Sequence, residues 1–261
     1  MNKVFAIAAI VAGLGASSAA QADLFSSINS INAQGTRWFN DFPNSTLTVT
    51  NNGLTSVRIQ DSNFIGTGFT NRHHTALAVN NTPYLFSGAQ AFRLDVDVII
   101  TGPGPAVTEA GIWVGTAPNY PSSALADVGN FVLLPDNSGE IAAFGGGLPF
   151  FSNNQPANSG MNRAVRNATR HLTFIYNTSP GGSSINYGVD GIFTGNQGFG
   201  GLNPNTYIGF YTQGPNGAGG VPVHAGNIDV TFSNITIAVP GPATASLLGM
   251  GGLLAARRRR R

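Results

Sequence analysis

Apolar and polar residues alternate along several stretches of the chain between residues 23 and 238. In residues 92–100, FRLDVDVII, every second side chain is apolar, whereas Arg93, Asp95 and Asp97 fall on the opposite face. A period of two is typical of β-strands that are buried on one side only. Runs of the same kind occupy residues 47–50, 110–114, 130–134, 171–176, 185–189, 206–212 and 228–232. Because no segment of this region keeps a helical stripe over three turns, we predict an all-β domain.

Local signals predict how some of these strands are connected. Asp190-Gly191 separates two strand-like runs, and this dipeptide supplies the positive φ angles of a type I′ hairpin turn. In the last run, Ile235 and Ile237 are out of phase with the apolar residues before them, which predicts a β-bulge at Ser233-Asn234. Segments rich in glycine and proline are expected to be surface loops, at residues 101–107, 144–160 and 213–222.

The region from residue 23 to residue 238 contains no internal repeat and no linker long enough to divide it, so we expect one domain. Short antiparallel strands without helices favour a sandwich or a barrel. The segments HLTFIYN, INYGVDG, IGFYTQ and DVTFSNITI resemble the concanavalin A-like jelly roll of lectin and laminin-G-type domains, over roughly residues 90–237. The resemblance implies an antiparallel β-sandwich, and it does not by itself imply a function.

The first 22 residues have the layout of a secretory signal peptide. One early positive charge, Lys3, precedes an apolar run, and the small residues Ala20 and Ala22 form the expected cleavage site. The run is apolar all round, so it lacks the polar face of a helix that packs on a core. We therefore expect export through the Sec machinery and cleavage by signal peptidase after Ala22.

The last 23 residues combine a proline pair, an apolar segment at 243–256 and a terminal arginine cluster. Proline is tolerated at the start of a helix, so the apolar segment can be helical directly after Pro242. Fourteen residues of helix reach about 21 Å, against a hydrocarbon core of about 30 Å. Clustered arginines stay on the cytoplasmic side of a membrane. The tail is therefore expected to insert into the inner membrane but to be short for a permanent anchor.

This tail, residues 239–261, resembles the PEP-CTERM sorting signal, in which a Val-Pro-Glu-Pro motif precedes an apolar span and an arginine cluster. The matching residues are Val239, Pro240, Gly241 and Pro242, then Arg257, Arg258, Arg259, Arg260 and Arg261, and Gly241 stands where the family usually has glutamate. The resemblance implies that an exosortase cuts near the motif after transient insertion in the inner membrane. The protein would then be released or transferred at the cell surface. The alternative is a tail anchor that is never cut.

Charge and cysteine content exclude several classes of function for the domain. Between Asp23 and Val239 there are seven arginines, no lysine and eleven acidic residues, a formal charge of −4. This region lacks the clustered basic residues that nucleic acids require, so no nucleic-acid partner is expected. Cysteine is absent, and the fold must therefore rely on its core without disulfides.

The acidic residues give little support to an enzyme. Glycoside hydrolases need two carboxylates on either side of the scissile bond, but the only glutamates, Glu109 and Glu140, lie in different segments. A Gly-x-Ser-x-Gly nucleophile elbow is also missing from the domain. We therefore predict a non-enzymatic domain that needs no cofactor.

Metal binding has only weak candidates in the sequence. Calcium prefers oxygen ligands, which the four aspartates Asp95, Asp97, Asp190 and Asp229 could supply with neighbouring asparagines. A charge-balanced outer strand face, with Arg93 beside Asp95 and Asp97, is the preferred interpretation of that segment. Zinc is disfavoured because the adjacent His73 and His74 point to opposite faces of a strand, and His171 and His224 are distant.

Aromatic side chains could form a platform on which sugar rings stack. The candidates are Trp38, Tyr84, Trp113, Tyr120 and Tyr211, of which Trp113 is expected in the core and Trp38 could take either role. The leading hypothesis is a non-enzymatic protein of the cell surface or extracellular matrix that contacts exopolysaccharide. Its rivals are a lectin-like carbohydrate-binding protein and a carbohydrate-active hydrolase on the same fold.

Overall fold

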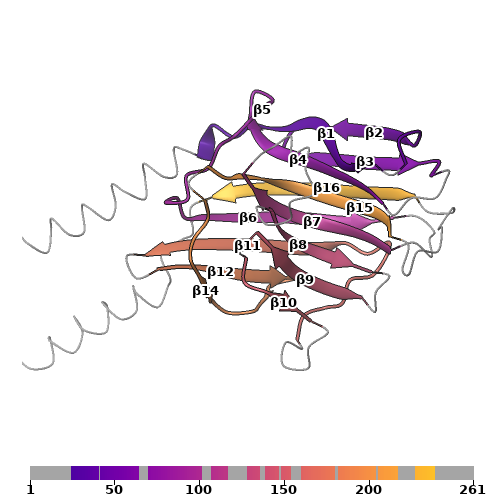
Figure 1. The fold of residues 1–261 in the computed structure, drawn as a ribbon. Coiled ribbons are helices and arrows are strands. Elements are labelled where there is room, and N and C mark those ends of the chain that lie inside the picture. The colour runs from indigo at the N-terminus through magenta and orange to yellow at the C-terminus, as the bar shows by residue number, and fades with distance from the viewer. Residues whose placement is uncertain are drawn as a thin grey trace, which may run out of the picture.

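The computed structural model describes residues 25–40, 42–64, 70–101, 107–116, 128–135, 139–146, 148–153, 160–179, 182–203, 205–216 and 227–238 (Figure 1). The predicted signal peptide, sorting motif, hydrophobic helix and arginine cluster all lie outside these residues. Within the described ranges, no helix is both long and apolar enough to cross a membrane.

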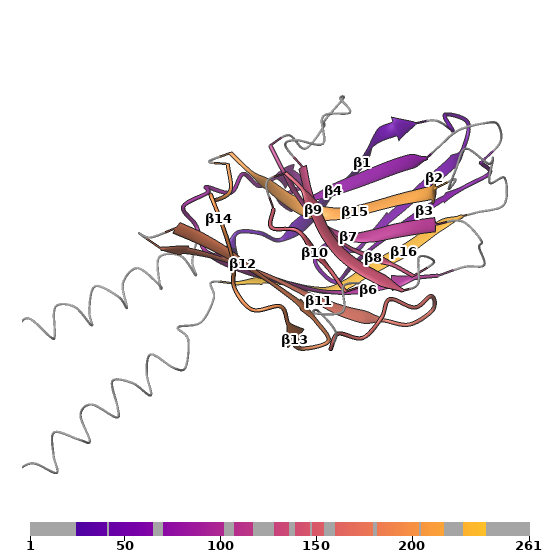
Figure 2. The ribbon, with the colours of Figure 1, turned by 60° about the horizontal axis from the view of Figure 1, so that its bottom comes forward.

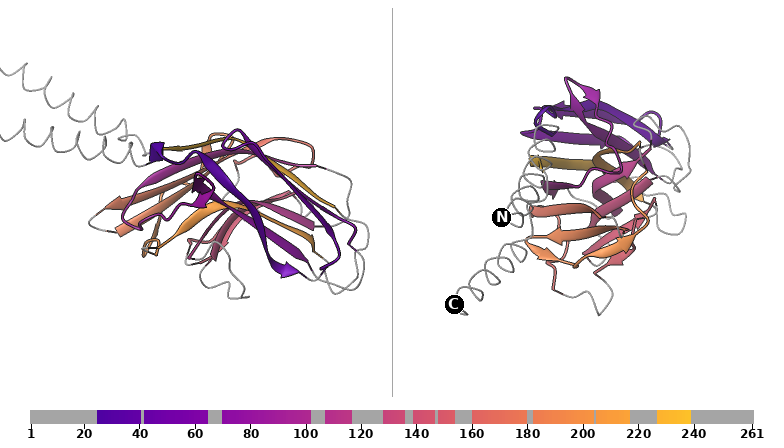
Figure 3. Two further views of the ribbon diagram at one scale, coloured as in Figure 1. Left: turned by 90° about the horizontal axis from the view of Figure 1, so that it is seen from above. Right: turned by 90° about the vertical axis from the view of Figure 1, so that its left-hand side faces the viewer.

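The described residues form two antiparallel sheets that pack face to face as a β-sandwich (Figure 2). Sheet A has the order β1 (Ser30–Asn40), β4 (Asn71–Val79), β15 (Tyr207–Asn216), β7 (Val107–Gly115), β8 (Val128–Leu134), β9 (Glu140–Gly145) and β10 (Phe151–Ser152), and β5 (Thr82–Pro83) pairs with β4. Sheet B has the order β13 (Ile192–Phe193), β12 (Gly182–Val189), β11 (Arg170–Ser179), β6 (Phe92–Ile100), β16 (Ile228–Ala238), β3 (Ser56–Ser62) and β2 (Thr46–Asn51), and β14 (Gln197–Phe199) pairs with β12. Figure 3 shows the two layers from above and from the side. The predicted all-β sandwich is confirmed.

In sheet B, the burial of the side chains follows the alternation of apolar and polar residues in the sequence. In β6 the residues alternate strictly between buried and half-buried, as predicted. The inward side chains of both sheets interdigitate to form the main core, in which Phe210 of β15 stacks on Phe232 of β16 with ring centroids 4.8 Å apart. Burying each such side chain contributes about 1.5–3 kcal/mol.

The predicted hairpin and bulge are both present. Asp190 and Gly191 have φ angles of 51° and 81°, and they connect β12 to β13. In β16, the register with β6 shifts between Ser233 and Thr236, and Asn234 has a φ angle of 52°. This shift moves the side chain of Ile235 back into the core.

All three predicted loops overlap strands, which corrects the sequence prediction. The segment 144–160 contains the end of β9 and all of β10, and the segment 213–222 contains the last residues of β15. Pro215 is accommodated because β15 changes register between Gln213 and Asn216, and proline is tolerated at such irregularities. Strand β7 likewise begins at Val107, the last residue of the predicted loop 101–107.

A buried polar cluster joins the two sheets at one end of the core. The Asp61 Oδ2 atom of β3 lies 2.9 Å from His73 Nε2 of β4 and accepts a hydrogen bond of 2.8 Å from Asn71 Nδ2. Burial raises the pKa of the Asp61 carboxyl, but hydrogen bonds from His73, Asn71 and Ser45 outweigh it, so this pKa lies below its ordinary value. The cluster therefore stabilises the ionised carboxylate between the sheets.

The central strands β4, β15, β7 and β8 of sheet A are buried on both faces, unlike those of a simple two-layer sandwich. In β4 the eight residues from Asn71 to Ala78 are all buried. A second apolar cluster lies on the face of sheet A that points away from the main core, and Trp113 and Tyr211 belong to it. Trp113 is thus buried, but on the outer side of the sheet and not between the sheets.

Candidate functional site

The outer face of sheet A, called the A face below, gathers chemically active side chains from five neighbouring strands. The strand registers place these residues in adjacent rows: Arg72, His74 and Ala76 of β4, Tyr207, Tyr211 and Gln213 of β15, Glu109 and Trp113 of β7, Asn130, Val132 and Leu134 of β8, and Glu140, Ala142 and Phe144 of β9. The polar and aromatic members on β4, β7, β8 and β15 are buried, apart from the half-buried Tyr207. We take this face as the candidate site.

A hydrogen-bonded network lies at the centre of the A face. The Tyr211 hydroxyl donates to Glu109 Oε2 at 2.9 Å and lies 3.0 Å from Gln213 Oε1. Gln213 Oε1 also accepts a hydrogen bond of 2.6 Å from Arg72 Nε, and the Arg72 guanidinium lies 5.5 Å from the centroid of the Tyr211 ring. Because these four side chains are only 0 to 8 % exposed, their geometry is fixed by one another.

Burial sets the protonation of the titratable groups in this network. It raises the pKa of the Tyr211 hydroxyl well above its ordinary value, and the negative charge of Glu109 raises it further, although Arg72 acts in the opposite direction. Burial also lowers the pKa of His74 well below its ordinary value, and electrostatic interactions with Arg72 and His73 lower it further. At neutral pH the A face therefore presents a neutral phenol and a neutral imidazole.

An aromatic group lies beside the network, and glycine makes its arrangement possible. The indole Nε1 of Trp113 donates a hydrogen bond of 2.7 Å to the backbone oxygen of Thr75, reaching from β7 to β4 across β15. The residue crossed is Gly209, where a Cβ atom would overlap the Thr75 carbonyl oxygen. The His74 ring packs edge-on against Trp113 at 4.9 Å and against Tyr211 at 5.2 Å.

The two glutamates, far apart in the sequence, lie on this same face. Glu109 is on β7 and Glu140 is on β9, with β8 between them, so their backbones are separated by about 10 Å. Glu109 accepts the hydrogen bond from Tyr211, and Glu140 Oε1 accepts one of 2.7 Å from Ser152 Oγ. Both carboxylates are thus held by neighbouring hydroxyl groups.

The four calcium candidates lie on sheet B or its connections and not on the A face. Asp95 accepts two hydrogen bonds from Arg93, of 2.6 and 2.8 Å, and Asp229 accepts two from Arg58, of 2.8 and 2.7 Å. Burial raises the pKa of each of these two carboxyls, but the bonds from arginine outweigh it and leave both pKa values below the ordinary value.

The other two aspartates are also engaged by protein donors. Asp97 lies 2.7 Å from His171 Nδ1 and accepts a bond of 2.7 Å from Asn234, and Asp190 accepts bonds from the backbone of His171 and from Asn162. Within the described part of the chain, no three His, Cys, Asp or Glu residues are grouped as metal ligands. The pairing of Arg93 with Asp95 confirms the predicted charge-balanced outer face of β6.

The remaining candidates from the sequence are dispersed. His73 points into the core and His74 onto the A face, as predicted for adjacent strand residues, and His171 is on sheet B. Tyr84 packs against Phe86 with ring centroids 4.7 Å apart. Tyr120, His224 and the side chain of Trp38 lie outside the described part of the structure.

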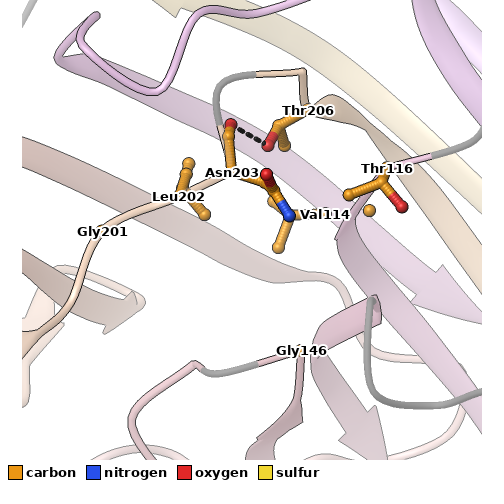
Figure 4. Close-up of a pocket in the computed structure, with 8 residues that line it drawn as sticks. Val114, Thr116, Gly146, Gly201, Leu202, Asn203 and Thr206 are labelled. Carbon is orange, nitrogen blue, oxygen red and sulfur yellow. Dashed lines mark hydrogen bonds between the residues drawn. The ribbon is translucent and has the colours of Figure 1, made fainter.

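A small cavity of about 280 Å³ lies near the end of β7. Its lining comprises Val114, Gly115, Thr116, Gly146, Gly201, Leu202, Asn203 and Thr206, none of which is charged (Figure 4). The Thr206 hydroxyl donates a hydrogen bond of 2.7 Å to the backbone oxygen of Asn203. The cavity is smaller than most ligand sites, and the polar groups of its lining are limited to backbone, amide and hydroxyl groups.

Comparisons with known proteins identify the fold. No protein-family model and no curated protein matches the chain. A GlcNAcα1-4Gal-releasing endo-β-galactosidase from Clostridium perfringens is similar in structure, with 10% identity and a TM-score of 0.50 over 78% of this chain and 57% of that one. An alginate lyase from Corynebacterium sp. has 12% identity and a TM-score of 0.46 over 70% of this chain and 77% of that one. An endo-1,3-β-glucanase from Streptomyces sioyaensis has 16% identity and a TM-score of 0.46 over 74% of this chain and 79% of that one.

At 10% identity and a TM-score of 0.50, the similarity to the endo-β-galactosidase shows a shared fold and nothing finer. The two packed antiparallel sheets agree with the jelly-roll β-sandwich that the resemblance in the later half of the sequence implied. A shared fold does not determine the chemistry of the A face, which depends on its own residues.

Proposed function

We propose that this chain is an exported protein of the cell surface or extracellular matrix, whose sandwich domain binds polysaccharide on the A face without turning it over. Export is supported by the signal-like residues 1–22, and sorting by the PEP-CTERM-like tail at 239–261. In this scheme the tail holds the chain in the inner membrane until an exosortase cuts the tail near Pro240.

The observation that carries the binding proposal is the composition of the A face. Polysaccharides are held by aromatic rings and by planar groups that donate or accept hydrogen bonds. The A face combines the rings of Trp113 and Tyr211 with the guanidinium of Arg72 and the amides of Gln213 and Asn130. An ordinary outer sheet face would instead carry solvated, charge-balanced pairs, as sheet B does at Arg93 and Asp95.

The electrostatics of the A face favour binding over catalysis. General acid–base catalysis works best with groups that titrate near the working pH. Burial moves the pKa of Tyr211 up and that of His74 down, away from neutrality. The rival hypothesis of a carbohydrate-active enzyme draws its support from Glu109 and Glu140 on one face, but each is already hydrogen-bonded to a hydroxyl group.

A binding assay combined with a turnover assay tests the proposal. The full-length protein is titrated with exopolysaccharide from its own host, and the same mixtures are assayed for new reducing ends and for unsaturated products. We expect saturable binding without turnover, and a loss of at least tenfold in affinity for Arg72→Met. Gln60→Ala, on the outer side of sheet B beside Asp229, serves as the control and should bind normally. Turnover by the wild type would contradict the proposal and show that the domain is an enzyme.

A further inference from the structure

Asn130 on β8 has an unusual environment. Its side chain is 0 % exposed, yet neither Nδ2 nor Oδ1 has a hydrogen-bond partner in the described structure. A buried amide without partners loses its hydration and gains nothing in return, so it destabilises the folded chain. Buried polar groups are rarely left in this state, and a functional role is one of the accepted reasons.

The position of Asn130 places this amide within the A face. It pairs across the strands with Trp113 on one side and with Phe144 on the other. Its next neighbour along the same face of β8 is Val132, which is opposite Gly111 in the row that contains Tyr211. The amide therefore lies between two aromatic residues, one row along the face from the row of Tyr211.

We propose that Asn130 determines the specificity of the A face by recognising two adjacent hydroxyl groups of a sugar ring. The amide Nδ2 would donate to one hydroxyl oxygen, and Oδ1 would accept from the other hydroxyl. This inference rests on the proposed binding function and narrows its ligand to a polysaccharide with free vicinal diols. An amide both donates and accepts hydrogen bonds, so it is complementary to a pair of hydroxyl groups, each of which can do the same.

Burial of the amide has a kinetic consequence. A ligand reaches a side chain that is 0 % exposed only after the groups that bury it have moved. Association is therefore expected to be slower than for an open groove, in which the bound conformation already exists.

The stability of a single variant separates recognition from a structural role. Asn130→Leu replaces the amide with an apolar side chain of similar size, so it removes two buried polar atoms that lack partners. We expect the full-length variant to melt at the same or a higher temperature than the wild type while its affinity for the host exopolysaccharide falls at least tenfold, roughly what a lost pair of hydrogen bonds produces.

Thr212→Val is the matched control. The Thr212 hydroxyl is also buried without a partner, but it lies on the inward side of β15, between Tyr211 and Gln213 that face outward. Its removal should preserve or raise the melting temperature and leave binding unchanged. A fall in melting temperature for Asn130→Leu, or unchanged affinity, would overturn the proposal.

Chemical treatment of the polysaccharide tests the ligand class independently. Periodate cleaves the carbon–carbon bond of a vicinal diol and, after borohydride reduction, leaves polysaccharide without such pairs. Wild-type protein should bind the treated host exopolysaccharide at least tenfold more weakly than the untreated material. Unchanged binding after oxidation contradicts the role of Asn130, whereas no binding to either material contradicts the proposed function itself.

Discussion

Tyr211 is the residue through which the polar and aromatic parts of the A face are connected. Its hydroxyl bonds to Glu109 and lies near Gln213, while its ring contacts His74 and Arg72. Such a side chain contributes both to stability and to the shape of the site. Removing the hydroxyl leaves a buried carboxylate without one of its donors.

Replacing Tyr211 with phenylalanine should therefore destabilise the protein by about 1–3 kcal/mol. Tyr207→Phe is the matched control, because Tyr207 is on the same strand and face but only half-buried. Its effect should stay within about 0.5 kcal/mol. Urea denaturation of both variants measures the difference, and equal effects would show that the buried network has no special energetic role.

The sequence indicated part of this site at the residue scale. Trp113, Tyr211 and Glu109 were candidates on chemical grounds, whereas Arg72, Asn130 and Gln213 were not. Their role depends on strand register, which brings Arg72 beside Gln213 although they are 141 positions apart. The one local signal was the tripeptide at 211–213, in which Tyr211 and Gln213 share a strand face.

At the scale of elements, β15 holds the A face together because it lies between β4 and β7. The indole of Trp113 crosses it at Gly209 to reach the backbone of β4. No other residue type fits there, since a Cβ atom would overlap the Thr75 carbonyl oxygen. The close approach of the strands and the position of the indole thus both depend on the missing side chain of Gly209.

Gly209→Ala should destabilise the fold by about 1–3 kcal/mol, because the strands must separate to admit the methyl group. Gly198→Ala is the control, because a Cβ atom at Gly198 meets nothing within 4 Å. Thermal unfolding compares the two, and the tryptophan emission of the Gly209 variant should shift as Trp113 moves. A stable Gly209→Ala variant with unchanged emission would contradict the described packing.

Most of the long strands were predictable, including β7, β8 and β15, which are buried on both faces, but β4 was not. The run in β6 alternates and was correctly placed, as were those in β2, β7, β8, β11, β12, β15 and β16. Strand β4, NRHHTALAV, carries polar residues on both faces, because Asn71 and His73 join the inner cluster while Arg72 and His74 join the A face. No period of two remains in such a segment.

At the scale of the whole molecule, Asp61 links the two sheets through His73 and Asn71. The pKa of Asp61 is lower in the folded state than its ordinary value. The ionised carboxylate therefore stabilises the fold at neutral pH, and this contribution is lost as the pH falls through the lowered pKa.

Asp61→Asn should cost roughly 3–5 kcal/mol at pH 7, because it disrupts a buried hydrogen-bonded pair. Its stability should then change less than that of the wild type between pH 7 and pH 3. Asp229→Asn removes a carboxylate from a pair with Arg58, whose side chain is 47% exposed, and should have a smaller effect at pH 7. Melting temperatures across this pH range test the prediction. Parallel curves for wild type and Asp61→Asn would contradict the contribution of the Asp61 carboxylate to the pH dependence of stability.

In the proposed function, the two ends of the chain deliver the domain to the cell surface. Replacing Arg257 to Arg261 with serine should weaken insertion and orientation, because the positive charge that stays in the cytoplasm is gone. Replacing Pro240 and Pro242 with alanine should leave insertion intact and block cutting. Fractionation of cells that express each variant separates the two effects.

Delivery to the cell surface is the claim on which the proposed function depends, and one experiment tests it directly. The chain is expressed in a host that has an exosortase, with one epitope tag before Pro240 and another after Pro242. Immunoblots of the inner membrane and outer fractions follow both tags. The proximal tag should reach the outer fraction without the distal tag, because the proposal places a cut near the motif. If both tags remain together in the inner membrane, the chain is a tail-anchored protein and the sorting hypothesis is wrong.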